Sequence, residues 1–429
     1  MSPNLFPTLP VLEDLAELVT KTKGRILEGS CLVCVQHLLE STGSLFEACE
    51  QLGLLSSDCF VLGKSYSASQ EVFDQCIKKG IHVRVNRADG KRAGFEKEFT
   101  NYVDRLWIEV RRQLRNKKYK QIIIVDDGGH CIERLPATIS RSTSIRAVEQ
   151  TTSGVRRIAS TCPVPVVNVA TSAAKSFIEA PLIVDAVLSR LTAHFPPPPS
   201  AVGVVGLGRI GASLATILRD KHYQVFAYDD RHHCLPGVTN CRDARELLHR
   251  VEYVFGCTGG DVIRPEWVAQ IRGEKTLISC SSEDREFRSL LDYVQQEHLD
   301  VIRDAKDDLT VKLPESRLRI VRGGYPANFD RQNESVPSRD IQVTRGLLLA
   351  GIVQASLLTS GSSPQLLKLD PHAQMFVVED WLHHLPERQS SYSPELLQHF
   401  RDVKWICMQS EGAAVDMPDA FYQAESVRA

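Results

Sequence analysis

The sequence lacks an excess of charge of either sign. Its 429 residues include 51 lysines and arginines and 53 aspartates and glutamates, so the formal net charge is −2 at pH 7. Both signs are mixed along the chain, and no charged cluster typical of a nucleic-acid-binding or membrane-binding protein is present. We therefore expect neither nucleic acid nor a membrane among its partners.

Long hydrophobic runs are also missing. A membrane-spanning helix needs a run of about 18 apolar residues, and the chain has none. The N-terminal segment MSPNLFPTLPVLEDLAELVTK carries acidic residues where a secretory signal needs an apolar run. We therefore expect a cytoplasmic globular protein, for which an apolar content of 43% provides well-buried cores.

Closely spaced cysteines are scarce, although the chain has 12 cysteines in all. Cys31 and Cys34 form a close pair, but no second pair is present to complete a zinc site. We therefore predict no metal site. The pair lies in SCLVCV, which has the pattern of a buried strand, whereas a redox-active thiol needs an exposed position at a helix N-terminus. The cysteines are accordingly expected to be reduced thiols.

A proline run, PPPPS at 196–200, marks the clearest boundary in the chain. Consecutive prolines exclude a helix and make a stiff, extended connector. Before this run, apolar segments such as CLVCV and CFVLG alternate with amphipathic ones such as STGSLFEACEQLG and SQEVFDQCIKKG. This alternation predicts a parallel sheet covered by helices on both faces, over residues 1–195.

The segment after the prolines, AVGVVGLGRIGASLATILRDKHYQVFAYDD, has the pattern of strand, glycine-rich turn, helix and second strand. It contains a G-x-G-x-x-G motif directly after the first strand and an aspartate at the end of the second. A dinucleotide-binding unit needs these parts for a tight turn, for a pyrophosphate at the helix N-terminus and for the adenosine ribose. We therefore predict a Rossmann domain over residues 200–339 that binds NAD rather than NADP. The residues expected to contact NAD here are Gly206, Gly208, Arg209, Ile210, Gly211, Asp229, Thr258 and Gly259.

The remainder of the chain, residues 340–429, is expected to return to the first domain. DIQVTRGLLLAGIVQASLLTSG, at 340–361, predicts a long apolar core helix, while VEDWLHHLPE and SPELLQHFRD have the pattern of surface helices. The predicted fold is α/β, with two doubly wound, Rossmann-like parallel sheets. Ligands are expected in the cleft between the domains, at the carboxyl ends of the strands.

Three separated segments occur in a fixed order before the glycine motif: IIIVDDGG, VEQTTSGV and NVATSAAKSF. Together they resemble the DDGG turn, the EETTTG loop and the T-K-S-K-F-D-N helix start of the S-adenosylhomocysteine hydrolase family. The resemblance spans roughly residues 25–360. It implies a held NAD, an adenosine-like small-molecule ligand, a homo-oligomer, and a reaction that begins with oxidation of a ribose hydroxyl by NAD.

The resemblance also implies site residues. Asp127 matches the family's DDGG aspartate, and Lys175 matches the lysine that activates the sugar hydroxyl. Glu179 replaces the aspartate four residues after that lysine, so Asp127, Lys175 and Glu179 are the implied catalytic residues. Gln150 stands where the family has a glutamate facing the sugar. An amide can hold a hydroxyl but cannot take its proton, so Gln150 is an implied substrate-binding residue.

The hydroxyl run Thr151, Thr152 and Ser153 matches the family residues that touch NAD. Other family positions differ in this chain. The histidine of the family's C-L-H-M-T motif corresponds to Val33, with His37 nearby, and the C-terminal lysine and tyrosine that reach a neighbouring subunit have no counterpart in FYQAESVRA. Several acid–base groups are thus replaced, and each is typically worth about 10²–10⁴ in rate. We therefore expect ordinary S-adenosylhomocysteine hydrolysis to be impaired.

Three functions stay open at this point. The first is an enzyme that oxidises a ribosyl hydroxyl of an adenosine-like ligand with bound NAD. The second is a non-catalytic protein that senses NAD and an adenosine compound. The third is a D-2-hydroxyacid dehydrogenase, for which the GLGRIG turn is equally typical and which would need a substrate-binding arginine such as Arg322 together with a histidine.

Overall fold

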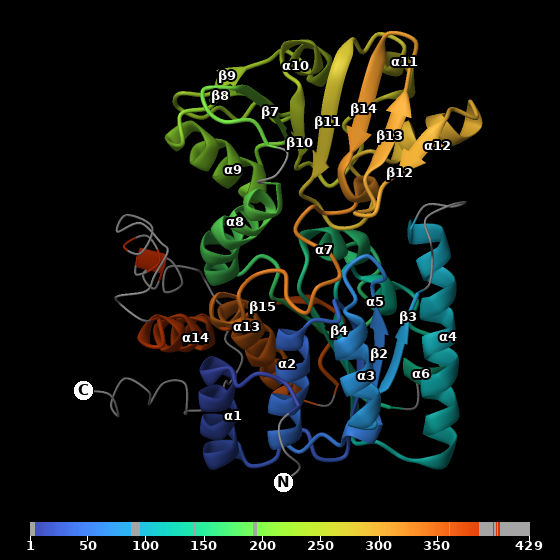
Figure 1. Ribbon diagram of the computed structural model, residues 1–429. Helices are drawn as coiled ribbons and strands as arrows, with labels where there is room; N and C mark the ends of the chain where they lie inside the picture. Colours follow the sequence, from blue (N-terminus) through green and yellow to red (C-terminus); the bar gives the residue numbers. More distant parts are fainter. Residues whose placement is uncertain are drawn as a thin grey trace. The chain divides into compact units, whose positions relative to one another are not determined.

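The computed structural model describes residues 5–86, 95–140, 143–191, 195–359 and 361–385, together with 398, 400, 402 and 403. These residues form two compact units (Figure 1). Unit 1 comprises the described residues of Met1–Asp89, Lys97–Glu179 and Arg331–Ala429, and unit 2 comprises those of Gly90–Glu96 and Ala180–Asp330. Each unit is built on its own sheet with helices packed against it, which confirms the predicted α/β fold of two Rossmann-like sheets.

Unit 1 has a seven-stranded sheet in which neighbouring strands are parallel, in the order β15-β6-β5-β4-β1-β2-β3. The strands are β1 (Ser30–Gln36), β2 (Cys59–Gly63), β3 (His82–Val85), β4 (Gln121–Asp126), β5 (Ile145–Glu149), β6 (Val166–Asn168) and β15 (Leu366–Lys368). Every residue of β1 and β4 is buried, because helices cover both faces of a parallel sheet. This explains why these strands are continuous apolar runs rather than alternating ones.

The strand order of unit 1 reverses between β1 and β4. The chain runs from β1 outward through β2 to β3, and then resumes on the other side of β1 with β4, β5 and β6. The crossover connections therefore part at the carboxyl ends of β1 and β4. Open parallel sheets bind their ligands outside this reversal point.

The long helix α13 (Ser338–Leu357) lies at the centre of the helical layer of unit 1. Each residue from Asp340 to Ala355 is buried, and the helix packs against β4, β5, β6, α1, α2 and α14. Its apolar character on all sides follows from that central place. The other helices of unit 1 are α1 (Pro10–Lys23), α2 (Glu40–Gln51), α3 (Gln70–Lys78), α4 (Phe95–Asn116, which starts within unit 2), α5 (His130–Glu133), α6 (Ala137–Ser140), α7 (Thr152–Ile158), α14 (Pro371–His383) and the short turns η1 (Ser56–Asp58) and η2 (Lys175–Glu179).

Helix α14 corrects one expectation from the sequence. It contains most of VEDWLHHLPE, which was expected to form a surface helix, yet Val377, Val378 and Trp381 are buried. The expectation was wrong because α14 packs against α13 and α1, so that even Asp380 is buried. The segment SPELLQHFRD lies mostly outside the described residues.

Unit 2 has an eight-stranded sheet in the order β12-β13-β14-β11-β10-β7-β8-β9. The strands are β7 (Ala201–Val205), β8 (Gln224–Tyr228), β9 (Thr239–Asn240), β10 (Tyr253–Gly256), β11 (Gly273–Ser279), β12 (Val301–Arg303), β13 (Leu309–Lys312) and β14 (Ser316–Ile320). Six strands are parallel, and β12 and β13 extend the β14 edge in antiparallel pairing. The order reverses between β7 and β10, which places a second reversal point at the glycine motif.

The first boundary between the units lies ahead of the proline run. Helix α8 (Ala180–Leu191) precedes the prolines, but it packs against α9 (Arg209–Asp220), and Val184 shares a hydrophobic core with Leu214. The units therefore divide at 179/180 and 330/331 rather than at 195–200 and 340. Prolines stiffen the chain, whereas a boundary falls where few contacts cross it. The remaining helices of unit 2 are α10 (Ala244–Arg250), α11 (Pro265–Val268), α12 (Arg288–Gln296) and the 3-10 turn η3 (Val321–Gly324).

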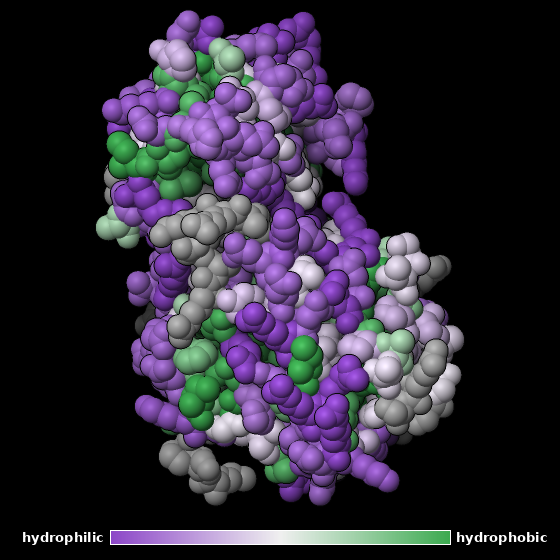
Figure 2. All heavy atoms as spheres, turned by 90° about the vertical axis from the view of Figure 1, so that its right-hand side faces the viewer, coloured by the Kyte–Doolittle hydropathy of each residue, from purple (hydrophilic) through white to green (hydrophobic). Residues whose placement is uncertain are grey.

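The apolar side chains lie mainly in the cores, where Trp107, Trp381 and Phe255 are among the largest fully buried ones. The side of the molecule drawn in Figure 2 is largely hydrophilic, with smaller hydrophobic areas. Within the described ranges, no helix is both long enough and apolar enough to cross a bilayer.

Candidate functional site

Four buried polar residues occupy equivalent positions at the carboxyl edge of the unit 1 sheet. Each is the first residue after its strand. In the order β1, β2, β4 and β5, they are His37, Lys64, Asp127 and Gln150. Because these strands are parallel and adjacent, their carboxyl ends meet at one edge, and the reversal between β1 and β4 lies within it. The structure thus brings the predicted Asp127 and Gln150 together and adds two residues to them.

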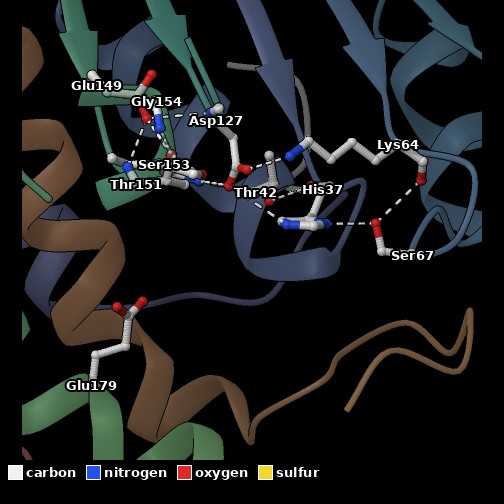
Figure 3. Close-up of polar contacts among 12 residues, drawn as sticks. His37, Thr42, Lys64, Ser67, Asp127, Glu149, Thr151, Ser153, Gly154 and Glu179 are labelled. Carbon is white, nitrogen blue, oxygen red and sulfur yellow. Dashed lines mark hydrogen bonds and ion pairs between the residues drawn. The ribbon is translucent and has the colours of Figure 1, made fainter. Parts of the chain in front are cut away.

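Asp127 is the centre of this group (Figure 3). Its Oδ1 accepts a hydrogen bond from Lys64 Nζ at 2.5 Å, while its Oδ2 accepts one from Gln150 Nε2 and lies 3.5 Å from His37 Nε2. Burial raises the pKa of the Asp127 carboxyl, but the charges of Lys64 and His37 outweigh burial and hold the pKa below its usual range. Asp127 is therefore ionised and already paired within the protein.

His37 links Asp127 to Ser67. Its Nδ1 lies 2.6 Å from Ser67 Oγ, and its Nε2 faces Asp127 (Figure 3). Val33, the position matched to the family's first-strand histidine, lies inside β1, where it pairs in register with strands on both sides. Val33 in mid-strand does not reach the carboxyl edge, whereas His37 follows the strand directly.

Asp126 and Glu149 form a second pair of carboxyl groups, one residue earlier on β4 and β5. The two residues are paired in register and are fully buried. Burial raises the pKa of both, and the adjacent carboxylates Asp126 and Asp127 raise that of Glu149 further. Glu149 Oε1 also accepts hydrogen bonds from the backbone N–H groups of Gly128 and Thr151. The Glu149 carboxyl therefore keeps its proton well above the pH at which an exposed glutamate ionises.

The hydroxyl run after Glu149 begins helix α7. Thr151 is its N-cap: Thr151 Oγ1 accepts a hydrogen bond from the Gly154 N–H at 3.0 Å and donates one to Glu149 Oε1 at 2.7 Å. Ser153 Oγ donates to Thr151 Oγ1 at 3.3 Å, while Thr152 is exposed. These contacts give Thr151 and Ser153 a local structural role. The NAD contact of Thr151, Thr152 and Ser153 stays a prediction.

Lys175 and Glu179 meet across a π-helical turn, η2. Lys175 Nζ donates a hydrogen bond to Glu179 Oε1 at 2.9 Å, and the two side chains are 11% and 21% exposed. Single π turns are frequent at functional sites because they change the direction of side chains within a helix. The two predicted catalytic residues thus form a hydrogen-bonded ion pair that is partly exposed.

Arg345 is a buried cation that the sequence analysis missed. It lies on α13, and its Nε donates to Ser41 Oγ at 3.1 Å. Burial lowers the pKa of Arg345, while the charges of Glu334, Glu179 and Asp127 raise it. Arg345 is therefore within electrostatic range of both Glu179 and Asp127. The available signal was an arginine directly before the apolar run GLLLAGIV, within a helix expected to lie in the core.

The glycine motif of unit 2 connects β7 to α9. Gly206 has a φ of 91°, and a Cβ on it would lie 2.9 Å from the backbone carbonyl that follows β10. A Cβ on Gly211 would lie 1.8 Å from the Gly206 carbonyl oxygen, so both glycines are required by the turn. Gly208 differs, because a Cβ there would meet nothing within 4 Å. This leaves open space beside Arg209 and Ile210, which begin α9.

Asp229 follows β8 and contacts the glycine turn. Its Oδ2 accepts a hydrogen bond from the Leu207 N–H at 2.7 Å, and its Oδ1 accepts one from the Arg231 N–H at 2.9 Å. Burial raises the pKa of Asp229, but these backbone donors and the neighbouring His233 lower it by more. An ionised carboxylate thus lies beside the turn, in the place where the acid of a dinucleotide-binding unit meets the ribose.

The loop after β10 completes this edge of unit 2. Thr258 Oγ1 lies 2.9 Å from Glu286 Oε2, and the Gly259 N–H donates to Glu286 Oε1 at 2.6 Å. Burial raises the pKa of Glu286 to about 7, although the hydrogen bonds it accepts act in the opposite direction. Glu286 was not predicted, because SSEDREF has the composition of an ordinary polar loop.

Arg322 does not support a substrate-binding role of the dehydrogenase type. Its Nη1 donates to the carbonyl oxygen of Lys306 at 3.0 Å, and its backbone N–H donates to Asp308 Oδ1 at 2.9 Å. The guanidinium is therefore directed to the turn between β12 and β13.

Among the residues that the structure describes, one group of possible metal ligands lies on α1, on α14 and at His384, directly after α14. Side-chain atoms of Asp14, Asp380 and His384 lie within 4.8 Å of one another. His384 Nε2 is 3.1 Å from Asp14 Oδ2 and 3.8 Å from Asp380 Oδ1, so the imidazole already faces both carboxyl groups. We assign no metal to this group.

The comparisons with known proteins give distant likenesses. No family model matches the chain. Two relatives, the uncharacterized proteins MT0113 and Rv0104 of Mycobacterium tuberculosis (strains CDC 1551 / Oshkosh and ATCC 25618 / H37Rv), are each 28% identical over 349 residues, which cover 80% of this chain and 67% of theirs. Among solved structures, 2-hydroxyacid dehydrogenase from Ketogulonicigenium vulgare Y25 has a TM-score of 0.37 at 15% identity, covering 78% of this chain and 99% of that one. Dipicolinate synthase A chain from Bacillus subtilis has a TM-score of 0.34 at 9% identity, covering 62% and 84%.

Proposed function

We propose that this chain is an NAD-binding protein of the adenosylhomocysteinase type, with NAD held by unit 2. The observation that carries the proposal is the contact of Asp229 with the glycine turn, where Oδ2 lies 2.7 Å from the Leu207 nitrogen. An ionised carboxylate after the second strand suits a ribose, and the open space at Gly208 suits a pyrophosphate at the start of α9. Bound NAD would supply the hydride acceptor.

We further propose that unit 1 binds an adenosine-like ligand and that a ribosyl hydroxyl of this ligand is oxidised. Oxidation removes a hydride from carbon and a proton from the hydroxyl, so the protein must accept that proton. Lys175 Nζ would take it while passing a proton to Glu179 Oε1, 2.9 Å away. Gln150 would hold a hydroxyl without deprotonating it.

The second candidate is a protein that binds NAD and an adenosine compound without chemistry. Asp127 favours this candidate, because its carboxylate already accepts hydrogen bonds from Lys64 and Gln150. These bonds, the charge of Lys64 and that of His37 lower its pKa, which makes Asp127 a weak base.

The test is the NADH absorbance of NAD-loaded protein after adenosine is added. Lys175→Met removes the ion pair of Lys175 with Glu179. The matched control is Lys21→Met, which breaks an exposed lysine–glutamate pair with the same spacing of four residues. A rise in the wild type and in Lys21→Met that is lost in Lys175→Met supports oxidation. A flat trace, with binding of NAD and adenosine shown by calorimetry, supports the second candidate. Failure to bind NAD contradicts both.

A further inference from the structure

Unit 2 contains a cavity that none of the predicted NAD-contacting residues lines. The cavity is shallow and opens to solvent, and its lining rather than its size indicates what it could bind. Four cationic side chains from four separate elements line it: Arg190 on α8, Lys306 between β12 and β13, Arg319 on β14 and Arg322 in η3. Among the described residues that line the cavity, Asp308 is the single acid.

The floor of the cavity is one face of the unit 2 sheet. Tyr253, Thr276 and Arg319 are neighbours in register on β10, β11 and β14. Side chains two residues apart point to the same face of a strand, so Ile278 continues the face that Thr276 begins. The ring of Phe195 lies 5.6 Å from that of Tyr253, centroid to centroid. One side of the cavity is therefore apolar and aromatic, and the other side is cationic.

Two of the four cations, Arg319 and Arg190, are each paired with a carboxylate. Asp308 Oδ2 accepts hydrogen bonds from Arg319 Nε at 2.9 Å and Nη2 at 2.7 Å, and Asp330 Oδ2 lies 3.1 Å from Arg190 Nε. In the part of the chain that the structure describes, Lys306 and Arg322 form no ion pair with a carboxylate. The cavity therefore keeps a surplus of positive charge that a bound anion would neutralise.

The backbone at Arg322 adds an independent observation. Arg322 has a φ of 52°, in the left-handed region, and the same turn continues through two glycines with positive φ. A residue with a side chain seldom adopts this conformation, and such residues cluster at ligand sites, where the surrounding structure maintains them. Here the strained residue is one of the two cations without a carboxylate partner.

We propose that this cavity binds a phosphomonoester that carries an apolar ring. The phosphate contacts Lys306 and Arg322, and the ring lies against Phe195 and Tyr253. A phosphate offers three terminal oxygens and close to two negative charges at neutral pH, which several cations can share, whereas one arginine is enough for a carboxylate. The site is separate from the proposed NAD site and does not depend on it.

The test uses phenyl phosphate as the probe, titrated into the full-length protein by calorimetry. Inorganic phosphate and phenol represent its two halves, and benzoate represents a carboxylate of similar size. The variants are Lys306→Gln and Arg322→Gln, with Lys312→Gln on β13 as a control that removes an exposed charge outside the cavity. Lys306 is exposed, so Lys306→Gln provides a test even if Arg322→Gln disturbs the fold.

We expect phenyl phosphate to bind at least tenfold more tightly than inorganic phosphate, phenol or benzoate. The affinity should fall at least fivefold in Lys306→Gln and in Arg322→Gln, and stay within twofold in Lys312→Gln. Saturating NAD should leave the affinity unchanged. The proposal is overturned if phenyl phosphate does not bind, if its affinity falls equally in Lys312→Gln, or if benzoate binds as tightly. It is also overturned if NAD displaces phenyl phosphate, because the phosphate would then lie at the glycine turn.

Discussion

Lys64 Nζ lies 2.5 Å from Asp127 Oδ1, and the two side chains are 0% and 4% exposed. Each residue directly follows a parallel strand, so the sheet itself brings them together. A buried ion pair is tolerated while both partners are present, whereas loss of one leaves an uncompensated charge away from water. The aspartate implied to be catalytic therefore also stabilises the fold of unit 1.

Lys64→Met should lower the free energy of unfolding by about 3–5 kcal/mol, because it leaves the charge of Asp127 buried without its closest cation. Adding Asp127→Asn should recover part of this loss. The measurement is equilibrium chemical denaturation, with the exposed Lys118→Met as a control that should stay within about 0.5 kcal/mol of the wild type. A loss of less than about 1 kcal/mol in Lys64→Met would contradict the assignment of a buried ion pair.

Glu286→Gln should change how stability depends on pH. The pKa of Glu286 is about 7 in the folded protein against 4.5 in the unfolded chain, so the folded state holds the extra proton and the wild type loses stability as pH rises through this window. Glutamine does not ionise, so the stability of Glu286→Gln does not change with pH for this reason. Compared with Glu286→Gln, the free energy of unfolding of the wild type should fall by about 3 kcal/mol between pH 4.5 and about pH 8. Denaturation curves at several pH values measure the difference, and Glu274→Gln, at an exposed position, is the control. Parallel pH profiles for the wild type and Glu286→Gln would rule out the raised pKa.

Gly208→Ala and Gly211→Ala should separate cofactor binding from folding. A Cβ on Gly208 meets nothing within 4 Å, so the free energy of unfolding should change by less than about 0.5 kcal/mol. The same methyl group would occupy the space proposed for the pyrophosphate, and NAD affinity should fall about tenfold or more. Gly211→Ala should instead destabilise the protein by about 1–3 kcal/mol, because its Cβ would lie 1.8 Å from the Gly206 carbonyl oxygen. Unchanged NAD affinity in Gly208→Ala would place the pyrophosphate elsewhere.

Thr151→Ala should destabilise the protein by about 1 kcal/mol, since it removes the N-cap of α7 and a donor to Glu149. Thr151→Ser keeps the hydroxyl and should restore most of the stability. Thr152→Ala, at an exposed position, should leave stability unchanged and weaken NAD binding if the hydroxyl run contacts the cofactor. Thermal denaturation and NAD titration of all three variants decide between a capping role and a cofactor role. Normal NAD affinity in Thr152→Ala would show that its predicted cofactor contact is wrong.

The features of this protein that depend on neighbours in the chain were predictable from its residues. Alternating apolar and amphipathic segments predicted two parallel sheets, because a strand buried on both faces is a continuous apolar run, whereas a helix buried on one face has apolar residues at a period of about 3.6. Glycines directly after an apolar strand predicted the turn at Gly206 and Gly211, since the positive φ of Gly206 and the contact between Gly211 and the Gly206 carbonyl oxygen both arise within the turn. The position of Asp229 at the end of the second strand followed from the same local spacing.

The contacts between distant segments required the folded chain. His37, Lys64 and Asp127 meet because the strand order places β4 beside β1 and β1 beside β2, and periodicity within a segment does not encode that order. Arg345 joins the same unit through α13; the sequence shows a charge within a core helix, but only the fold shows which charges it faces. The burial of α14 and the boundary at 179/180 likewise follow from helix packing. Local sterics and burial period thus specify the elements and the turn, whereas the pairing of strands and helices specifies which charges share a site.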